Sequence, residues 1–194
     1  MRFGSSSQAI RVDRPDEIDA SGKADTAWHP GCCRSARMAT MIEPNLTFRL
    51  AVRSDLERIV QLLADDPLGR KREVFSIPVA SSYERAFEAI AEDRNNELIV
   101  AEQAATVVGV LQITFLPYLT HQGSWRALIE GVRVAAEVRS SGVGKRLFMW
   151  AIDRARERKC LLVQLTSDKS RPDAIRFYQS LGFKASHEGF KLEL

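Results

Sequence analysis

The pattern of hydrophobic and polar residues first becomes regular near residue 47. Residues 47 to 51 form a short strand-like run, and apolar residues at helical spacing follow it. These apolar residues are Leu56, Ile59, Val60 and Leu63. They predict a helix that begins at a capping box of Ser54 and Glu57 and ends before Asp66-Pro67. A weaker helix is expected over about 81 to 93, after a loop.

From residue 98 onward the pattern changes to strands. Residues 98 to 101 and 106 to 116 flank a short turn and predict an antiparallel hairpin. Further strands are expected over 125 to 134 and 160 to 166. Amphipathic helices are predicted over about 142 to 158 and again before Gly182, which would cap the second one. Two final strands are expected at 183 to 184 and 188 to 194.

The order of these elements, β-α-α-β-β-β-α-β-α-β-β, predicts a mixed α/β (α+β) fold in one domain over residues 46–194. Residues 1–45 are rich in Ser, Gly, Asp, Arg and Pro and show neither helical nor strand periodicity, so they are expected to be a disordered extension. No apolar run approaches the roughly 18 residues of a membrane helix, and no secretory signal stands at the N-terminus. Three cysteines without a disulfide pattern favour a cytoplasmic location.

Charge narrows the ligand class only a little. The 28 basic and 25 acidic residues are interspersed, which does not point to nucleic acid and suits an anionic ligand bound by a few local groups. The three histidines have no cysteine or carboxylate at metal-ligand spacing, so no metal is predicted.

The turn Arg139-Ser140-Ser141-Gly142-Val143-Gly144 is the strongest local signal. It joins a predicted strand to a predicted helix, whose free N–H groups would attract phosphate, while glycine lets a ligand approach the backbone. Side chains of Arg139, Ser140, Ser141 and Lys145 would add donors. Such turns are also common as plain structure, and this one is neither a dinucleotide fingerprint nor a Walker loop. It predicts a pyrophosphate site without identifying the nucleotide.

Three motifs in this order resemble the GNAT superfamily of acyl-CoA-dependent N-acetyltransferases. They are Ile129-Glu130-Gly131-Val132-Arg133-Val134, then Arg139-x-x-Gly142-x-Gly144, then Ala174-Ile175-Arg176-Phe177-Tyr178-Gln179-Ser180-Leu181-Gly182-Phe183. The resemblance covers about residues 47 to 194. It implies a mostly antiparallel, twisted sheet with a central splay, flanked by helices, and the pantetheine arm of acetyl-CoA in the gap. The residues that would bind acetyl-CoA are Val132, Arg133, Val134, Arg139, Ser140, Ser141, Gly142, Val143, Gly144 and Lys145.

The resemblance implies one catalytic residue, Tyr178, and the local sequence around Glu130 suggests a second. Tyr178 would lie near the thioester sulfur and protonate the departing thiolate, although its place on an apolar stripe also suits a plain core residue. Glu130 is the candidate base, because a partly desolvated site would raise its pKa toward a useful range. An ion pair with Arg126 or Arg133, or a base acting through water, stays open. Arg171 stands where many relatives have Asn, and it could reach a phosphate.

The acceptor is the least defined part of the prediction. Tyr118, His121 and Trp125 flank the loop before the strand at 125 to 134, where an acceptor could enter. The predicted function is acetyl transfer from acetyl-CoA to a primary amine of a small molecule or peptide, by direct attack through a tetrahedral intermediate. A protein lysine acetyltransferase and a non-catalytic acyl-CoA sensor or interaction module are the alternatives, and a homodimer is open.

Overall fold

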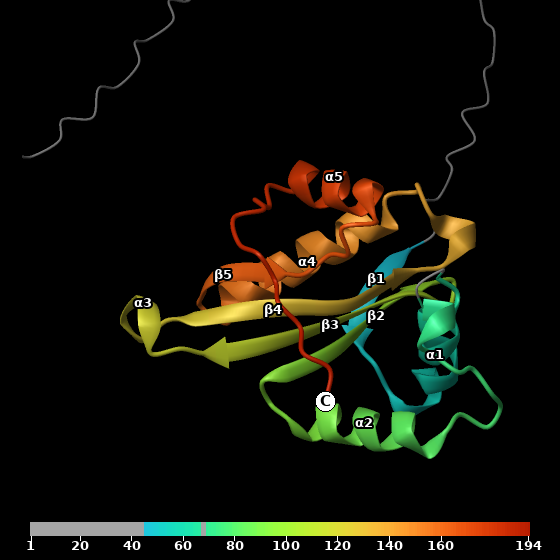
Figure 1. The fold of residues 1–194 in the computed structure, drawn as a ribbon. Helices are drawn as coiled ribbons and strands as arrows, with labels where there is room; N and C mark the ends of the chain where they lie inside the picture. Colours follow the sequence, from blue (N-terminus) through green and yellow to red (C-terminus); the bar gives the residue numbers. More distant parts are fainter. Residues whose placement is uncertain (1–44, 67–68) are drawn as a thin grey trace, which may run out of the picture. The chain divides into compact units, whose positions relative to one another are not determined.

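A computed structural model of the chain describes residues 45–66 and 69–194 (Figure 1). The predicted N-terminal extension lies outside the described residues, apart from its last position, Asn45. The described part contains a five-stranded sheet in the order β1-β2-β3-β4-β5. Its strands are β1 Leu46–Leu50, β2 Asn96–Gln103, β3 Thr106–Pro117, β4 Trp125–Val134 and β5 Cys160–Leu165.

The sheet is mixed, and three of its four pairings are antiparallel. Strands β1 to β4 pair antiparallel in sequence order, and β5 runs parallel to β4. The predicted hairpin is β2–β3, and Gln103 pairs with Thr106 across a two-residue turn. Both turn residues, Ala104 and Ala105, have positive φ angles of 49° and 59°, as the twist of a two-residue hairpin demands. The mixed α/β prediction is confirmed.

Helices cover both faces of this sheet (Figure 1). Helices α1 (Leu56–Ala64) and α2 (Ser81–Glu92) lie on one face, and α4 (Val143–Glu157) and α5 (Pro172–Ser180) lie on the other. Short 3-10 turns occur at Arg53–Asp55, Gly69–Lys71 and Ala136–Val138, and α3 (Thr120–Gly123) is a single turn at the tip of the β3–β4 hairpin. The largest fully buried side chains are Phe115, Phe148, Ile99, Leu111, Ile113, Ile129, Leu147, Val60, Val100 and Val110.

The start of α1 differs from the sequence prediction. The capping box of Ser54 and Glu57 is wrong, since both residues are exposed and α1 begins at Leu56 after a 3-10 turn. Asp55 takes their place: its carboxylate accepts a hydrogen bond from the Val52 N–H at 2.8 Å. Arg49 also binds this carboxylate, and this contact from a neighbouring strand selects Asp55 over the local Ser/Glu pattern.

The predicted final strands are also wrong. Gly182 follows α5 with a φ of 92°, as expected for a helix cap, but within the described residues no strand follows β5. A strand needs a neighbour for its backbone groups, which sequence alternation alone does not supply. The last three alternating apolar residues, Phe190, Leu192 and Leu194, are exposed.

Strand β5 pairs with only the first half of β4. Their pairing ends at Ile129 opposite Leu165, while β4 continues to Val134. At the same point the β3–β4 register shifts by one residue, and Gly131 adopts a φ of 62°, which marks a β-bulge. Residues 130 to 134 therefore border a gap on the β5 side. We call this unpaired edge of β4 beyond the end of β5 the gap; the central splay that the resemblance implies stays a prediction.

None of the helices in the described ranges is both long and apolar enough to cross a membrane.

Candidate functional site

The turn before α4 offers free backbone amides. Gly142 is the residue that precedes the helix, with a φ of 86° that favours glycine. The first intrahelical hydrogen bond runs from Arg146 N to Gly142 O at 3.0 Å, so the amides of residues 143 to 145 have no acceptor inside the helix. Gly144 does not have a positive φ, and a Cβ there would meet protein atoms only at 3.6 Å or more. The fold itself therefore does not require glycine at 144. A ligand held against this backbone would require it, because a Cβ would take up the space of the ligand.

Two backbone carbonyls of β4 bind guanidinium groups. The Val132 carbonyl accepts a hydrogen bond from Arg133 Nη1 at 2.8 Å, and the Val134 carbonyl accepts one from Arg139 Nε at 3.2 Å. Arg139 also lies 4.0 Å from the Asp65 carboxylate. The turn brings Ser140, Ser141 and Lys145 to the start of α4 as exposed residues, but Arg139 points toward the end of α1. The ligand roles predicted for these residues stay predictions.

Tyr178 lies in an aromatic cluster and close to positive charge. Its ring centroid is 5.5 Å from that of Phe148, and the rings of Phe177 and Phe183 complete the cluster. Burial raises the pKa of the phenol above its ordinary value of 10.0, while Arg171 and Arg133 act in the opposite direction. The apolar stripe thus packs the ring, and the two guanidiniums are near enough to act on its hydroxyl.

Glu130 is exposed at the last position of β4 before the bulge, opposite Gln112. Neither arginine considered as its partner pairs with it in the described part of the chain. Arg126 donates to the Tyr118 hydroxyl at 2.8 Å, and Arg133 lies 3.3 Å from Asp66. The ion-pair interpretation of Glu130 is therefore not supported, which leaves its carboxylate available at the mouth of the gap.

Asp66 belongs to the site, and the sequence analysis did not identify it. It is 7% exposed, with its carboxylate 3.3 Å from Arg133 Nη2 and 3.8 Å from Arg171 Nη2. Asp66 follows α1 and Arg171 precedes α5, and these helices lie on opposite faces of the sheet (Figure 1). Their contact is possible because β5 has ended at Leu165. An aspartate before a proline reads only as a helix end, so no local signal reveals this contact.

The three residues predicted to bind the acceptor lie elsewhere. Tyr118 and His121 are at the β3–β4 hairpin tip, with ring centroids 5.7 Å apart, and Trp125 is the first residue of β4. At about 3.3 Å per residue, Trp125 is roughly 20 Å along the strand from Val132. The structure does not bring these side chains together with Glu130 or Tyr178, and their role stays a prediction. Among the described residues no group of three His, Cys, Asp or Glu side chains could hold a metal.

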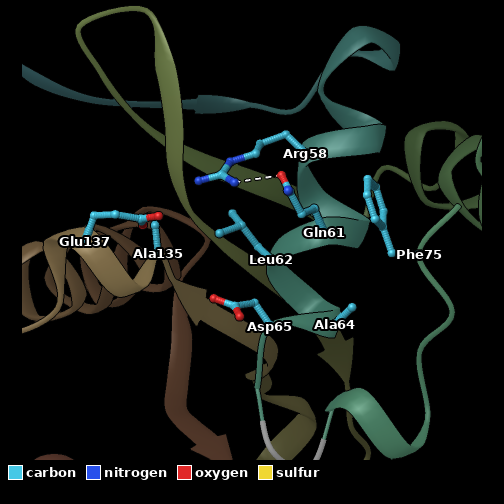
Figure 2. A pocket seen from close by; sticks show the side chains of 8 residues that line it. All are labelled: Arg58, Gln61, Leu62, Ala64, Asp65, Phe75, Ala135 and Glu137. Carbon is cyan, nitrogen blue, oxygen red and sulfur yellow. Dashed lines mark hydrogen bonds between the residues drawn. The ribbon is translucent and has the colours of Figure 1, made fainter. Parts of the chain in front are cut away.

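A surface cavity of about 350 Å³ opens between α1 and the segment after β4 (Figure 2). Its lining comprises Arg58, Gln61, Leu62, Ala64, Asp65, Phe75, Ala135 and Glu137. Arg58 donates to Gln61 across one wall at 2.7 Å. Neither Glu130 nor Tyr178 lines it, so it borders the Arg139 region and is not the place where those two side chains meet a substrate.

Comparisons with known proteins agree with this geometry. A family model described as "Acetyltransferase (GNAT) family" matches residues 56–183, which include β4, the turn and α5. The aminoalkylphosphonate N-acetyltransferase of Salmonella typhimurium is 29% identical over 109 residues, covering 56% of this chain and 70% of that protein. The glucosamine 6-phosphate N-acetyltransferase of Trypanosoma brucei brucei is 30% identical over 156 residues, covering 77% of this chain and 97% of that protein.

A solved structure is also similar to this chain over most of its length. It is described as a transcriptional regulator from Bacillus halodurans C-125, with 59% identity and a TM-score of 0.76. The match covers 77% of this chain and 100% of that one.

Proposed function

The chain belongs to the GNAT acetyltransferase family, and from this premise we propose that it transfers the acetyl group of acetyl-CoA to the primary amine of a small molecule. The observation that carries the proposal is that β4 continues beyond the end of β5 with Glu130 exposed on it, while burial raises the pKa of the Tyr178 phenol and Arg133 of the same strand acts to lower it. Both curated relatives are named for the N-acetylation of a small amine, which favours a small molecule over a protein lysine.

Acetyl-CoA would extend from the gap to the turn before α4. The Val132 and Val134 carbonyls would accept hydrogen bonds from the pantetheine amides in place of the two guanidiniums they now bind. The amides of residues 143 to 145 would bind the pyrophosphate. The fold does not require glycine at Gly144, so its presence there supports a ligand lying close to that backbone. Side chains of Arg139, Ser140, Ser141 and Lys145 would supply further donors.

The chemistry then needs one base and one acid. An alkylammonium with a pKa near about 10.4 must lose a proton before it can attack, and Glu130, directly or through a water, accepts that proton. The amine nitrogen bonds to the thioester carbonyl carbon and forms a tetrahedral intermediate, and this nitrogen then loses its second proton to solvent water, so that a neutral amide results. When the carbon–sulfur bond breaks, the thiolate takes the proton of the Tyr178 hydroxyl. Burial keeps this phenol protonated at neutral pH, and Arg171 and Arg133 stabilise the phenolate that donation leaves behind.

A thiol-release assay tests the proposal. Purified protein is incubated with acetyl-CoA and a panel of small amines, amino acids and lysine peptides, and N-acetyl products are identified by mass spectrometry. Turnover of at least one small amine, with less on peptides, is the expected result. Calorimetry with acetyl-CoA is run in parallel, so that a failure to bind the donor is separated from a failure to react.

The second candidate function is an acyl-CoA-binding regulator without turnover. It is favoured by one observation, the description of the 59% identical structure as a transcriptional regulator. Binding of acetyl-CoA without product from any acceptor would support this candidate and reject the enzyme.

A further inference from the structure

Two guanidinium groups share one buried carboxylate at the gap. Asp66 is contacted by Arg133 at 3.3 Å and by Arg171 at 3.8 Å. These three groups together carry one unit of positive charge. Arg72 and Glu73, which also act on Arg133, have opposite signs. The carboxylate of Asp168 acts on Arg171, but it is exposed and accepts hydrogen bonds from Ser170. The Arg133 guanidinium is only 13% exposed, so its charge is costly unless anions are nearby.

Both guanidiniums also retain unused donors. Arg133 has a side chain only 13% exposed, and its Nε is buried without a hydrogen-bond partner in the described structure. Its Nη1 donates to the Val132 carbonyl. Arg171 is 39% exposed, and its 3.8 Å contact with Asp66 is too long for a hydrogen bond. Buried donors almost always have a hydrogen-bond partner in folded proteins, so several guanidinium donors without one at the same place indicate a bound ligand.

The open donors lie at the reacting end of the proposed site. Arg133 stands on β4 beyond the end of its pairing with β5, and Arg171 reaches the same Asp66 carboxylate. Both arginines act on the Tyr178 phenol, so an anion bound to them would hold its molecule beside the proposed proton donor. The pyrophosphate has a separate place on the amides of α4, some residues further along the chain.

We propose that Arg133 and Arg171 bind an oxyanion of the acceptor, so that the substrate class is a small primary amine that also carries a phosphate, phosphonate or carboxylate. This inference rests on the proposed acetyl transfer. The planar guanidinium fork matches such groups with two parallel hydrogen bonds. Asp66 does not contact the substrate: it is a positioning residue that holds two like charges side by side.

The experiment compares acceptors in matched pairs that differ only in the anionic group. The pairs are O-phosphoethanolamine with ethanolamine, 2-aminoethylphosphonate with propylamine, and β-alanine with β-alaninamide. For the wild-type chain, kcat/KM should be at least about tenfold higher for the anionic member of at least one pair. The pair with the largest ratio identifies which oxyanion the site takes.

Arg171→Gln is the decisive variant, because this side chain is partly exposed and its loss spares the core. The ratio of anionic to neutral kcat/KM should fall about 10- to 100-fold, mostly through KM for the anionic acceptor. Arg171→Lys should recover part of the ratio, since it restores the charge without the fork. Arg176→Gln is the matched control: Arg176 is on the same helix, 68% exposed and paired with Asp173, and its ratio should equal that of the wild type.

Three results would overturn the proposal. The first is equal use of charged and neutral acceptors by the wild type. The second is an unchanged ratio in Arg171→Gln. The third is a rise in KM for acetyl-CoA without loss of acceptor preference, which would assign Arg171 to the donor phosphates instead.

If no acceptor is turned over, the proposed function fails but the anion site is still testable. Calorimetric titration with O-phosphoethanolamine and with ethanolamine, in the presence of CoA, measures it directly. Binding of the phosphate compound alone, lost in Arg171→Gln, supports the site. Equal or undetectable binding of both compounds rejects it.

Discussion

Two buried aspartates flank α1, and their surroundings differ in one respect. Asp55, just before the helix, accepts hydrogen bonds from Arg49 Nη1 at 2.6 Å, from Arg49 Nη2 at 3.0 Å and from the Val52 N–H at 2.8 Å. Asp66, after the helix, meets two arginines at 3.3 and 3.8 Å and accepts from the Gly69 N–H at 3.4 Å. The two carboxylates are equally buried, at 7% exposure each. We call the surroundings of Asp55 the tight region, because its hydrogen bonds are short. We call the surroundings of Asp66 the loose region, because its contacts are longer.

The difference separates a structural role from a binding role. Arg49 also contacts Glu102 at 2.6 Å, so the Asp55 network joins β1, β2 and the start of α1 and uses the donors it brings together. Its hydrogen bonds hold the pKa of Asp55 below the ordinary 3.8, which is what a stabilised carboxylate shows. The Asp66 network instead leaves donors open beside Tyr178. Departures from full satisfaction in native proteins are expected at functional sites.

The largest expected effect is on catalysis, in the loose region. Tyr178→Phe should lower kcat about 100-fold or more, because loss of a general acid typically costs 10² to 10⁴ in rate. The free energy of unfolding should change by less than about 1 kcal/mol, since the ring keeps its contacts with Phe148 and Phe183. Steady-state kinetics and urea unfolding measure the two quantities on the same sample.

Tyr83→Phe is the control for this variant. It removes a phenol that accepts from Val74 N and donates to Glu73 on the α2 side of the molecule. Its kcat should match that of the wild type. A Tyr178→Phe enzyme with wild-type kcat would return Tyr178 to the status of a core residue.

The next effect is on stability, in the tight region. Asp55→Asn should lower the free energy of unfolding by about 2 kcal/mol, because it converts hydrogen bonds to a charged acceptor into weaker ones. Hydrogen bonds to charged groups usually contribute about 1.5 to 3 kcal/mol, and the 37% exposure of Arg49 keeps this contribution from the upper end of that range. The selectivity between anionic and neutral acceptors should not change. Urea unfolding at neutral pH gives the first quantity and kinetics give the second.

The pH dependence of unfolding sharpens this prediction. The pKa of Asp55 is lower in the folded chain than its ordinary 3.8, so its contribution to stability is present above pH 3.8 and is lost as pH falls through the folded pKa. The wild type should lose stability more steeply than Asp55→Asn below that pH. Parallel curves for the two proteins would show that this aspartate is not stabilised by its partners.

The sequence predicted what local periodicity determines. The β2–β3 hairpin, β4, α4 and α5 follow from alternation or helical stripes, and they lie close to their expected bounds. The capping box failed because Asp55 is selected by Arg49, a residue outside the helix. The last strands failed because pairing needs a neighbour that alternation does not reveal.

The candidate site divides in the same way. Glu130, Tyr178 and the Gly142 turn stand in sequence motifs and could be predicted as such. The Asp66 cluster combines residues 66, 133 and 171, which only the separation of β4 from β5 brings into contact. An interaction that depends on three distant segments and a gap in a sheet leaves no local pattern.

The smallest expected effect tests the loose region itself. Asp66→Asn keeps the size of the side chain and removes its charge, so the guanidiniums of Arg133 and Arg171 repel each other without a shared anion. Arg171, the more exposed of the two, should move into solvent. The ratio of anionic to neutral kcat/KM should then fall about three- to tenfold, less than on removal of Arg171 itself.

Asp65→Asn supplies the matched control, because this neighbour is 47% exposed and pairs with Arg70 and Arg139 instead. Its acceptor ratio should equal that of the wild type. If Asp66→Asn instead destabilises the fold as much as Asp55→Asn and leaves the ratio intact, the long contacts of Asp66 are structural after all. The looseness of a buried ion pair would then not distinguish a binding role in this protein, and the anion would have to be sought at the Arg139 turn alone.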